Sequence, residues 1–376
     1  MIYRLFFRYV LLRLDPEDAH RLVSRILRST RRVPGIRPMM RALFSPEPPC
    51  LEVRALGLSF ANPLGVAAGV DKEADWFESL GDLGFGHVEV GTVTADGQGG
   101  NERPRIHRLP CDRALHNSMG FPNPGAAKLA GRLGARTGHP VVGVNIGKTR
   151  TVELQDAAAD YRRSVRLLAP SSDYVVLNVS SPNTPGLRSM QGLEDLRALI
   201  AAVRAELQSM GAEPPLLVKI GPDLPDAEIE AIADLAVEVE LAGIVAINTT
   251  SDASVLRHSG EEARSIGHGG ISGAPLKGRS MEVLRLLYAR AGGRLVLVSV
   301  GGVETAEDVW ERVAAGATLV QAYTGFLYGG PLWAARINRK LGRKVKAAGL
   351  SSLGELIGTA ASSGSGADQA AAVPPG

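Results

Sequence analysis

Short apolar runs alternate with amphipathic segments along most of this chain of 376 residues. The runs are five to seven residues long, rich in β-branched residues and bounded by polar residues or glycine, as is typical of buried β-strands. Eight of them occur, at residues 64–68, 87–93, 141–146, 174–179, 216–220, 243–248, 295–300 and 318–323. Between most of them the apolar residues recur at helical spacing, as in residues 153–168, 193–207, 227–239, 305–314 and 332–341.

Strands that alternate with helices predict parallel pairing through right-handed crossovers. Eight such strands can close into an α/β fold, the (β/α)8 TIM barrel, whose usual length of about 250 residues fits within residues 51–345 with an insertion. An open, doubly wound sheet is the alternative. Against it, no G-x-G-x-x-G motif follows the first strand, and the glycine pairs lie late in the chain.

The pattern also divides the chain into three parts. We expect an N-terminal helical segment at residues 1–41, the barrel domain at residues 42–348 and a low-complexity, disordered tail at residues 349–376, where Ala, Ser and Gly dominate. The longest interruption of the barrel pattern, residues 95–122, contains a strand-like run at residues 105–109. Loops of this length in compact domains are usually functional.

The N-terminal segment is predicted to form two short amphipathic helices. Residues 2–12 place apolar side chains near helical spacing with arginines between them. The second helix begins with Asp15 as N-cap and Pro16 at its first position. Its apolar stripe consists of Ala19, Leu22, Val23, Ile26 and Leu27. The first helix is too short and too charged to span a membrane, and its arginines argue against a signal peptide.

Basic charge is concentrated in the same segment. The chain has a formal net charge of +3, but residues 1–41 contain ten arginines and three acidic residues, a net +7 that leaves −4 for the remainder. Two basic amphipathic helices fit an element that lies on an anionic membrane surface. The alternative is a helical hairpin docked on its own domain. We expect no nucleic-acid binding, because no recognised module accompanies the arginines.

The small number of cysteines indicates the redox environment of the protein. Cys50 and Cys111 are the only cysteines of the sequence, which rules out a disulfide framework and suggests a reducing environment. No Cys/His cluster has zinc-ligand spacing, so we expect no structural metal.

Polar side chains follow several of the predicted strands, at the end where barrels place their active sites. The fourth strand leads into residues 178–186 (NVSSPNTPG), which can neither extend the strand nor start a helix at once, because each proline removes a donor. Asn145 and Asn248 end two other strands, so together with Asn178 and Asn183 four asparagines would converge at this end. Their amides, each with two donors and an acceptor, suit a planar heterocycle of the imide type.

Glycines late in the chain predict a phosphate site. Glycine pairs in residues 269–273 and at residues 301–302 flank the seventh strand, where barrels often bind phosphate through backbone N–H groups. Lys72 follows the first strand and Lys219 lies near the end of the fifth, so both are expected at the same end of the barrel. There they would offset the negative charge of a ligand. Paired carboxylates, a Ser-His-Asp order and an H-E-x-x-H motif are all missing from the sequence. A rim rich in amides and lysines therefore favours redox chemistry on a bound cofactor.

Ten motifs are similar to those of one known family. They are AAGVDK (67–72), EVGTVT (89–94), NSMGFPNPG (117–125), GVNIGK (143–148), NVSSPNTPGLR (178–188), VKIGPDL (218–224), INTT (247–250), GGISG (269–273), VGGV (300–303) and QAYTGF (321–326). Through these motifs the chain resembles the dihydroorotate dehydrogenases, specifically the membrane-associated, quinone-dependent class 2. The resemblance extends from about residue 3 to about residue 345. The resemblance implies an FMN-containing barrel that oxidises dihydroorotate to orotate in pyrimidine synthesis and passes the electrons to a quinone.

The resemblance also implies roles for individual residues. Ser181 is the catalytic base that removes the C5 proton, while the C6 hydrogen leaves as hydride to flavin N5. A serine is a poor base at its free pKa, so exclusion of water by the loop at residues 182–190 and a proton relay have to assist it. The implied substrate-binding residues are Lys72, Asn117, Ser118, Met119, Gly120, Phe121, Asn178, Asn183, Asn248 and Thr249. The implied FMN-binding residues are Ala68, Gly69, Thr92, Asn145, Asn178, Lys219, Ile247, Gly273, Gly302, Tyr323 and Thr324.

Within this set, Lys219 is expected near flavin N1/O2, where it would stabilise the reduced anion, and the last four residues are expected around the phosphate. One position departs from the family pattern. Ile247 stands where related chains often have Thr, so a backbone contact to flavin would survive and a hydroxyl contact would not.

The class assignment rests on Ser181, where class 1 enzymes carry Cys, and on the basic helical pair, which class 2 uses as a quinone entrance. His20, Arg103 and Tyr323 are expected to face the quinone path. We expect a monomer, bound peripherally to the cytoplasmic side of the cell membrane. Two alternatives stay open: a soluble flavoenzyme of the same barrel type that uses fumarate or NAD, and a non-catalytic barrel that binds a phosphorylated ligand at the membrane surface.

Overall fold

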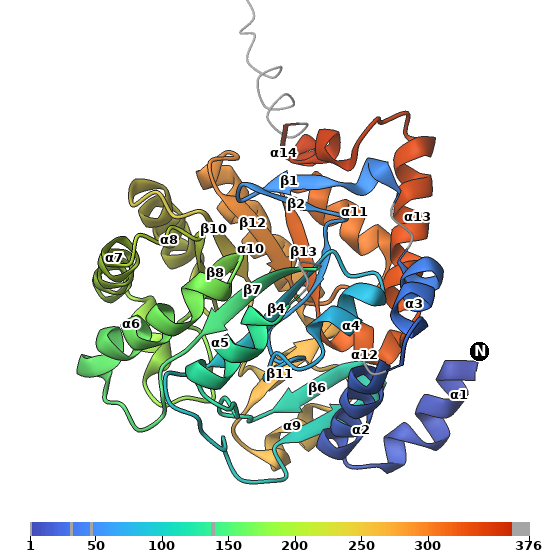
Figure 1. Cartoon of the computed structure of the whole chain (residues 1–376), viewed down its shortest axis with the longest axis horizontal. Helices are drawn as coiled ribbons and strands as arrows, with labels where there is room; N and C mark the ends of the chain where they lie inside the picture. The colour runs from blue at the N-terminus through green and yellow to red at the C-terminus, as the bar shows by residue number, and fades with distance from the viewer. Residues whose placement is uncertain (1, 31–32, 46–47, 137–139, 363–376) are drawn as a thin grey trace, which may run out of the picture.

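A computed structural model of the chain describes residues 2–30, 33–45, 48–136 and 140–362. Its centre is a closed barrel of eight parallel strands, each paired with the next barrel strand along the chain (Figure 1). These strands are β3 (Leu64–Val66), β4 (His87–Val93), β7 (Val141–Ile146), β8 (Tyr174–Asn178), β9 (Leu216–Ile220), β10 (Gly243–Ala246), β12 (Val296–Val300) and β13 (Leu319–Ala322). The predicted strands and the TIM-barrel fold are confirmed.

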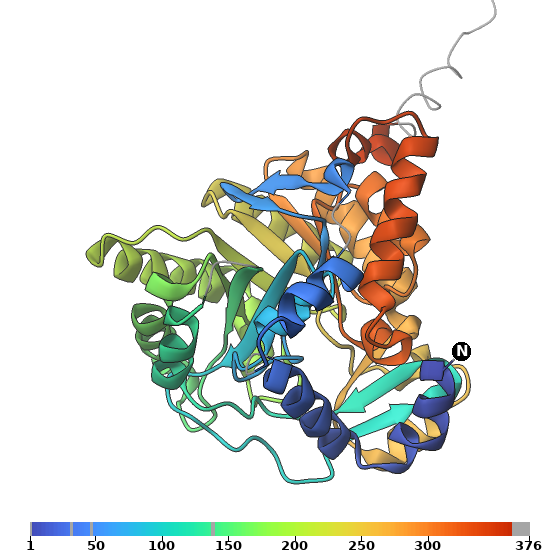
Figure 2. The ribbon, with the colours of Figure 1, turned by 45° about the vertical axis from the view of Figure 1, so that its right-hand side comes forward.

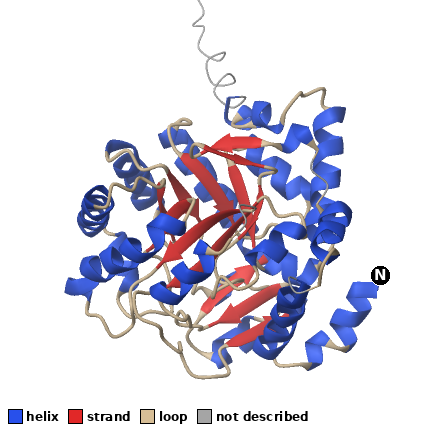
Figure 3. Ribbon diagram, in the orientation of Figure 1, coloured by secondary structure: helices blue, strands red, loops and turns tan. Residues whose placement is uncertain are grey.

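Helices cover the outside of the barrel (Figure 3). They are α4 (Phe77–Asp82), α5 (Ala126–Gly134), α6 (Ala157–Leu168), α7 (Leu193–Ser209), α8 (Asp226–Glu238), α10 (Lys277–Ala291), α11 (Ala306–Ala314) and α13 (Trp333–Ala347). Most strand residues are buried, because one face packs on these helices and the other fills the barrel. This double burial is why the strands are continuous apolar runs rather than alternating ones. The five predicted helices are confirmed, although the first of them begins with a 3-10 turn.

Short elements connect the barrel units. The 3-10 turns are η3 (Pro49–Leu51), η4 (Pro110–Asp112), η5 (Leu154–Asp156), η6 (Ala169–Ser171), η7 (Leu187–Gln191), η8 (Ala253–Val255) and η9 (Ala274–Leu276). Two further helices are α9 (Gly260–Ile266) and α12 (Thr324–Gly329). The α12 helix directly follows the last barrel strand, so it begins at the carboxyl end of the barrel.

The two ends of the barrel are closed differently (Figures 1 and 2). At the amino end lies a hairpin of β1 (Val53–Ala55) and β2 (Leu58–Phe60), whose Phe60 packs edge-on against His87 with ring centroids 5.5 Å apart. Phe60 and Val53 join the apolar cluster that fills the barrel. At the carboxyl end lies an antiparallel sheet of β5 (Ile106–Leu109), β6 (Ala114–Asn117) and β11 (Gly270–Gly273), which includes the strand expected at residues 105–109.

The N-terminal helices lie beside this carboxyl-end sheet (Figure 2). They are α1 (Ile2–Tyr9) and α2 (Pro16–Ser29), joined by the 3-10 turn η1 (Leu11–Arg13), whereas the next helix, α3 (Ile36–Phe44), packs against α4. Asp15 caps α2 as predicted, with Oδ1 accepting hydrogen bonds from the N–H groups of Glu17 and Asp18 at 2.9 and 3.1 Å. The α3 helix was not expected, and the boundary placed between residues 41 and 42 falls inside it. Its Arg37 and Arg41 both pair with Asp82 of α4.

The apolar stripe of α2 is divided between the protein and solvent. Ala19 is buried and Leu27 packs on the main core, whereas the side chains of Leu22 and Ile26 are 43% and 55% exposed. The α1 helix is divided in the same way, since Phe7 is buried while Leu5, Phe6, Tyr9 and, just after the helix, Val10 are exposed. Within the described ranges, no helix is both long enough and apolar enough to cross a membrane.

The C-terminal segment differs in part from the expected disordered tail. Residues 353–356 form the 3-10 turn η10 (Leu353–Leu356), which a capping box between Ser352 and Glu355 stabilises, and α14 (Thr359–Ser362) follows. Leu353 and Leu356 are buried against the core, which explains why this stretch is ordered despite its Ser- and Gly-rich surroundings. Residues 363–376 lie outside the described residues.

Candidate functional site

A cavity of about 1150 Å3, part of it open to solvent, lies at the carboxyl end of the barrel. It brings together all but two of the predicted site residues: Ala68, Gly69, Lys72, Thr92, Asn117, Met119, Gly120, Phe121, Asn178, Ser181, Asn183, Lys219, Ile247, Asn248, Thr249, Gly273, Gly302, Tyr323 and Thr324. The two that do not line it are Ser118 and Asn145. Instead, the Ser118 N–H donates to the Arg105 carbonyl, and the Ser118 carbonyl accepts a hydrogen bond from Asn101 Nδ2.

Amide and hydroxyl groups form one network in the cavity wall. Thr92 Oγ1 donates to Asn145 Oδ1 at 2.5 Å, and Asn178 Nδ2 donates to both of these oxygens, at 3.0 and 3.1 Å. Asn248 Nδ2 extends the network to Ser180 Oγ at 3.0 Å. Asn145 therefore does not line the cavity itself, but its hydrogen bonds fix the side chains of Thr92 and Asn178, which do. Three of the four predicted asparagines are joined in this way.

A buried carboxylate lies beneath this network. Glu89 of β4 is fully buried and accepts hydrogen bonds from Asn145 Nδ2 at 2.7 Å and Gln321 Nε2 at 2.9 Å. Its Oε1 is 3.5 Å from Nζ of Lys219, the only described cation that pairs with it. Lys219 was among the predicted site residues, whereas Glu89 and Gln321 were not, although both lie in motifs of the family pattern. The charged pair fixes the lysine at the cavity floor.

Ser181 is buried at the cavity wall, with its side chain 5% exposed. Its Oγ accepts a hydrogen bond from the backbone N–H of Asn183 at 3.2 Å. Asn183 Nδ2 in turn donates to the carbonyl and side-chain oxygens of Asn117, both at 3.2 Å. The Asn183 Oδ1 is buried without a hydrogen-bond partner among the described residues. An orphaned acceptor in a cavity wall fits a ligand that brings a donor.

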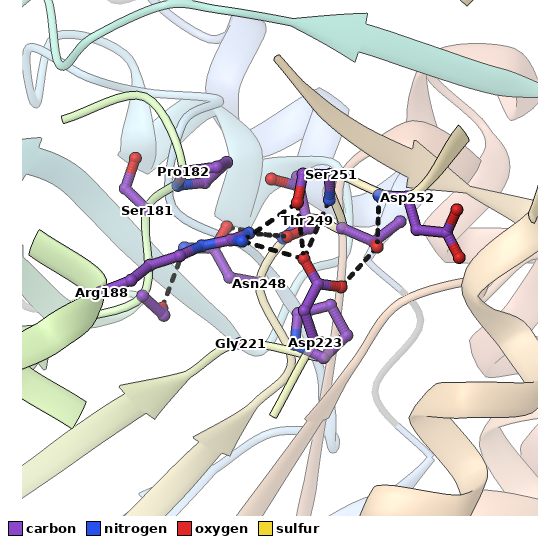
Figure 4. Close-up of polar contacts among 12 residues, drawn as sticks. Ser181, Pro182, Arg188, Gly221, Asp223, Asn248, Thr249, Ser251 and Asp252 are labelled. Atoms are coloured by element: carbon purple, nitrogen blue, oxygen red, sulfur yellow. Dashed lines mark hydrogen bonds and ion pairs between the residues drawn. The ribbon is translucent and has the colours of Figure 1, made fainter. Parts of the chain in front are cut away.

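The loop that follows Ser181 is anchored from across the cavity mouth (Figure 4). Arg188 is 3.0 Å from Asp223 Oδ2, and its guanidinium also donates to Ser251 Oγ at 3.1 Å and to the Thr249 carbonyl at 3.3 Å. On the other side of the loop, His268 Nε2 is 2.7 Å from the Pro182 carbonyl oxygen. Neither the arginine nor the aspartate was predicted as a site residue, although both lie in motifs of the family pattern, at residues 178–188 and 218–224.

Lys72 lies where the cavity meets the N-terminal helices. Its Nζ donates to the Gly69 carbonyl at 2.5 Å, and burial lowers the pKa of this lysine to about 8. At neutral pH most of the population is therefore still charged. A partly desolvated cation at a cavity wall suits a carboxylate ligand.

Glycines form a tight cradle at the other end of the cavity. Gly302 has φ +71°, and a Cβ there would lie 2.6 Å from Cα of Lys277. Gly273 has φ +109°, and a Cβ there would lie 2.4 Å from the Arg113 carbonyl oxygen. Side chains at these positions would displace the neighbouring backbone, so only glycine keeps the backbone N–H groups of this wall accessible. The hydroxyls of Thr324 and Ser272, 2.8 Å apart, lie beside it.

Glu17 connects α2 to the cavity end of the barrel. Burial alone would raise the pKa of its carboxyl, but hydrogen bonds and charge from Arg105 and Arg103 outweigh that effect and lower the pKa to about 2. His20, also on α2, packs edge-on against Trp76, and burial lowers its pKa to about 3. Tyr323 lines the cavity, while His20 lines an adjoining cavity with Lys72, so of the three residues expected on a quinone path only Tyr323 lies in the main cavity.

The donor set fits a flavin with a phosphate group. It combines amide side chains for a planar heterocycle, a buried lysine for a ring that becomes anionic on reduction, and a glycine cradle for a phosphate. Ile247 lines the cavity, and its backbone N–H donates a hydrogen bond to the Val300 carbonyl at 3.1 Å. That N–H is therefore not available for a flavin contact, which leaves the carbonyl and the apolar side chain.

Comparison with known proteins identifies the family. The sequence profile of dihydroorotate dehydrogenase matches residues 50–345. The chain is 52% identical to the dihydroorotate dehydrogenase (quinone) of Thermobifida fusca over 95% of this chain and 96% of the relative. It is 54% identical to the protein of the same name from Clavibacter michiganensis over 91% and 98%. The structure is also similar to the crystal structure of Eimeria tenella DHODH in complex with ferulenol, with a TM-score of 0.82, 36% identity and coverage of 92% and 95%. The chain belongs to the dihydroorotate dehydrogenase family, whose flavin-dependent members oxidise dihydroorotate to orotate in pyrimidine biosynthesis.

Proposed function

We propose that this chain oxidises dihydroorotate on bound FMN, with Ser181 as the catalytic base and a membrane quinone as the final electron acceptor. The observation that carries the proposal is the convergence of Ser181, Lys72, Lys219 and the glycine cradle on one cavity. A bound FMN supplies the hydride acceptor. The protein supplies binding, orientation and the removal of one proton.

Ser181 Oγ takes the proton from substrate C5 while its own hydroxyl proton passes on to a proton relay. Its Oγ accepts the Asn183 N–H, and this donor stabilises negative charge that develops on the oxygen. Burial of the side chain excludes water, which strengthens the interaction. The anchored loop keeps the hydroxyl at the cavity wall, since Arg188 and His268 hold it from two sides.

The amide groups bind and orient the substrate ring. Asn117, Asn178, Asn183 and Asn248 present donors and acceptors of the kind that pair with imide groups, and Lys72 offers a cation for the carboxylate. Met119, Gly120, Phe121 and Thr249 complete the wall. Ser118 supports this wall through its backbone bonds, without lining it.

The remaining residues hold FMN. Lys219 at the floor would stabilise negative charge on the reduced ring, and Ala68, Gly69, Thr92, Ile247 and Tyr323 border the same space. Gly273, Gly302, Tyr323 and Thr324 would surround the phosphate. Asn145 contributes indirectly, by fixing Thr92 and Asn178.

The N-terminal helices would deliver the quinone. The exposed apolar side chains of α1 and α2, together with the arginines of this segment, suit a peripheral element on an anionic membrane surface. We place the protein on the cytoplasmic side of the cell membrane as a monomer. Co-sedimentation with anionic vesicles, and its loss when residues 1–29 are removed, would test this placement; retained sedimentation would contradict it.

One experiment tests the proposed chemistry. The purified protein should be yellow, and addition of dihydroorotate without air should bleach the flavin absorbance. Identification of the released cofactor as FMN completes the test. A colourless protein, or a yellow one that dihydroorotate does not bleach, would contradict the proposal.

A further inference from the structure

Arg312 is an unusual residue for its position. It lies on α11, on the outside of the barrel wall, and is among the largest fully buried side chains of the described chain. Its guanidinium donates to Ser280 Oγ at 2.7 Å and to Ser299 Oγ at 2.6 Å. It also donates to the Gly301 carbonyl at 2.5 Å, while its Nε has no partner among the described residues.

All the acceptors of this guanidinium are neutral. No described carboxylate forms an ion pair with Arg312. The nearest candidate, Asp308 one turn earlier on α11, is already bound by the Lys277 ammonium and by the backbone N–H groups of Glu304 and Thr305, each at 2.9 Å. Burial lowers the pKa of Arg312 to about 10, so it stays protonated at neutral pH. A buried, unpaired charge is costly unless a ligand offsets it.

The Gly301 carbonyl shows where that ligand would lie. The peptide between Gly301 and Gly302 is not among the cis bonds of the described chain, so it is planar and trans. Its carbonyl and its N–H consequently point in opposite directions. Since Arg312 holds the carbonyl from the helix side of the wall, the Gly302 N–H points toward the cavity, which Gly301 and Gly302 line.

The same guanidinium ties together the elements around the glycine cradle. Ser280 belongs to α10, which follows Gly273, and Ser299 belongs to β12, which leads into Gly301. Ser280 Oγ also donates to the Val300 carbonyl at 2.6 Å. A hydrogen bond from a charged donor polarises the peptide and strengthens its N–H as a donor on the opposite side.

We propose that Arg312 is a positioning residue for the flavin phosphate: its buried charge aims and polarises the Gly302 N–H, and the phosphate dianion of the ligand compensates that charge. This inference rests on the proposed FMN site. It predicts a specificity, because riboflavin has the same ring system without the phosphate. Arg312 should contribute to binding of FMN and little to binding of riboflavin.

The test is a pair of titrations. The full chain, freed of flavin, is titrated with FMN and with riboflavin, as the unsubstituted protein and as Arg312→Met, Arg312→Lys and Arg285→Met. Arg285 is an exposed residue of α10 whose substitution makes the same change in net charge. Arg312→Met should weaken FMN binding by about tenfold or more and change riboflavin binding by less than about threefold. Arg312→Lys and Arg285→Met should keep the ratio of the two affinities within about threefold of the unsubstituted value.

Several results would overturn the proposal. An unchanged ratio in Arg312→Met, or equal losses for both flavins, would show a purely structural role. If Arg312→Met does not fold, Arg312→Lys provides the test, because it keeps the positive charge and changes the hydrogen bonds. A tenfold lower ratio of FMN to riboflavin affinity in Arg312→Lys would refute the role of the charge, and an unchanged ratio would support it. Failure of the unsubstituted chain to bind either flavin is a different outcome, which would refute the proposed function itself.

Discussion

The cavity floor and the N-terminal helices both contain buried or half-buried charges, but they hold them differently. At the floor, Glu89 and Lys219 are inside the barrel and surrounded by amides on strands whose neighbours are fixed by the closed sheet. In the N-terminal layer, Glu17 of α2 reaches across to arginines on a loop, while apolar residues of the same helix remain exposed. The floor holds its charges in a closed sheet, whereas the helices combine their ion pairs with exposed apolar side chains.

This difference suggests a division of labour. Proton and hydride removal need atoms held to within a fraction of an ångström, which a barrel interior provides. The proposed collection of a lipid-soluble quinone needs an apolar surface that can meet a membrane, and the exposed apolar side chains of the two amphipathic helices would provide one. Tyr323, which lines the cavity and whose pKa burial raises to about 12, lies at the border between the two regions and within the field of Glu17.

The largest effect is expected at Ser181. In Ser181→Ala the flavin should stay bound, because the cradle and the floor are unchanged, but turnover should fall about 10³-fold, as is usual when a general base is lost. Steady-state rates with dihydroorotate and a soluble quinone measure this. Ser189→Ala, in the same loop but exposed, is the matched control and should retain its activity. Comparable losses in both variants would point to the loop fold rather than to the hydroxyl.

Removal of α1 and α2 should separate the functions of the two regions, namely oxidation of dihydroorotate and reduction of quinone. A chain that begins at residue 30 keeps α3, whose Arg37 and Arg41 pair with α4, so the barrel should fold. Quinone reduction should drop about tenfold or more, whereas bleaching of the flavin by dihydroorotate should stay near its full rate. Intact quinone reduction in the shortened chain would refute the role of the helices.

A smaller effect is expected at the anchor of the loop. Arg188→Ala removes the contacts to Asp223, Ser251 and Thr249, so the loop should open more often. A loss of about 1–2 kcal/mol corresponds to an increase of about 5- to 30-fold in KM for dihydroorotate, with flavin content unchanged. Asp223→Asn should reproduce part of the effect, and no change in either variant would mean that the anchor does not control access.

The smallest effect concerns stability and pH at Glu17. Its depressed pKa means that it stabilises the fold above the pKa of the unfolded chain, about 4.5, and that this contribution is lost as pH falls toward about 2. Glu17→Gln should cost about 1–2 kcal/mol at neutral pH, because it leaves the buried Arg105 without its carboxylate. Thermal unfolding at a series of pH values measures this. The difference from the unsubstituted protein should shrink below pH 4.5, and Asp18→Asn, at a more exposed residue, should show little of it.

The sequence predicted the barrel and most of the cavity for a physical reason. Strands buried on both faces leave continuous apolar runs, and in a closed parallel barrel the residues after those runs must meet at one end. Asn178, Ser181 and Lys219 could therefore be grouped without a structure. Glu89, Gln321 and Arg312 could not, since a polar residue within a strand or on a helix of the barrel gives no sign of whether it faces the cavity, the floor or the space between strands and helices.

Two other parts were misread for a related reason. The α3 helix was not predicted, because a Pro-Gly pair such as Pro34-Gly35 usually marks the end of a helix, whereas Gly35 with φ +81° is here the N-cap of α3. The composition of residues 349–376 predicts a disordered tail, but the buried Leu353 and Leu356 anchor residues 353–356 on the core, although most of the neighbouring side chains stay exposed. Local composition does not reveal a tertiary contact.

The most direct test of the division of labour is to measure the two half-reactions separately in two variants, with rapid mixing and without air. The account predicts that Ser181→Ala loses flavin reduction by dihydroorotate but, once chemically reduced, is reoxidised by quinone at the normal rate. The chain that begins at residue 30 should show the reverse. If either variant lost both half-reactions to the same extent, or if Ser181→Ala were reduced at the normal rate, the central claim would be wrong.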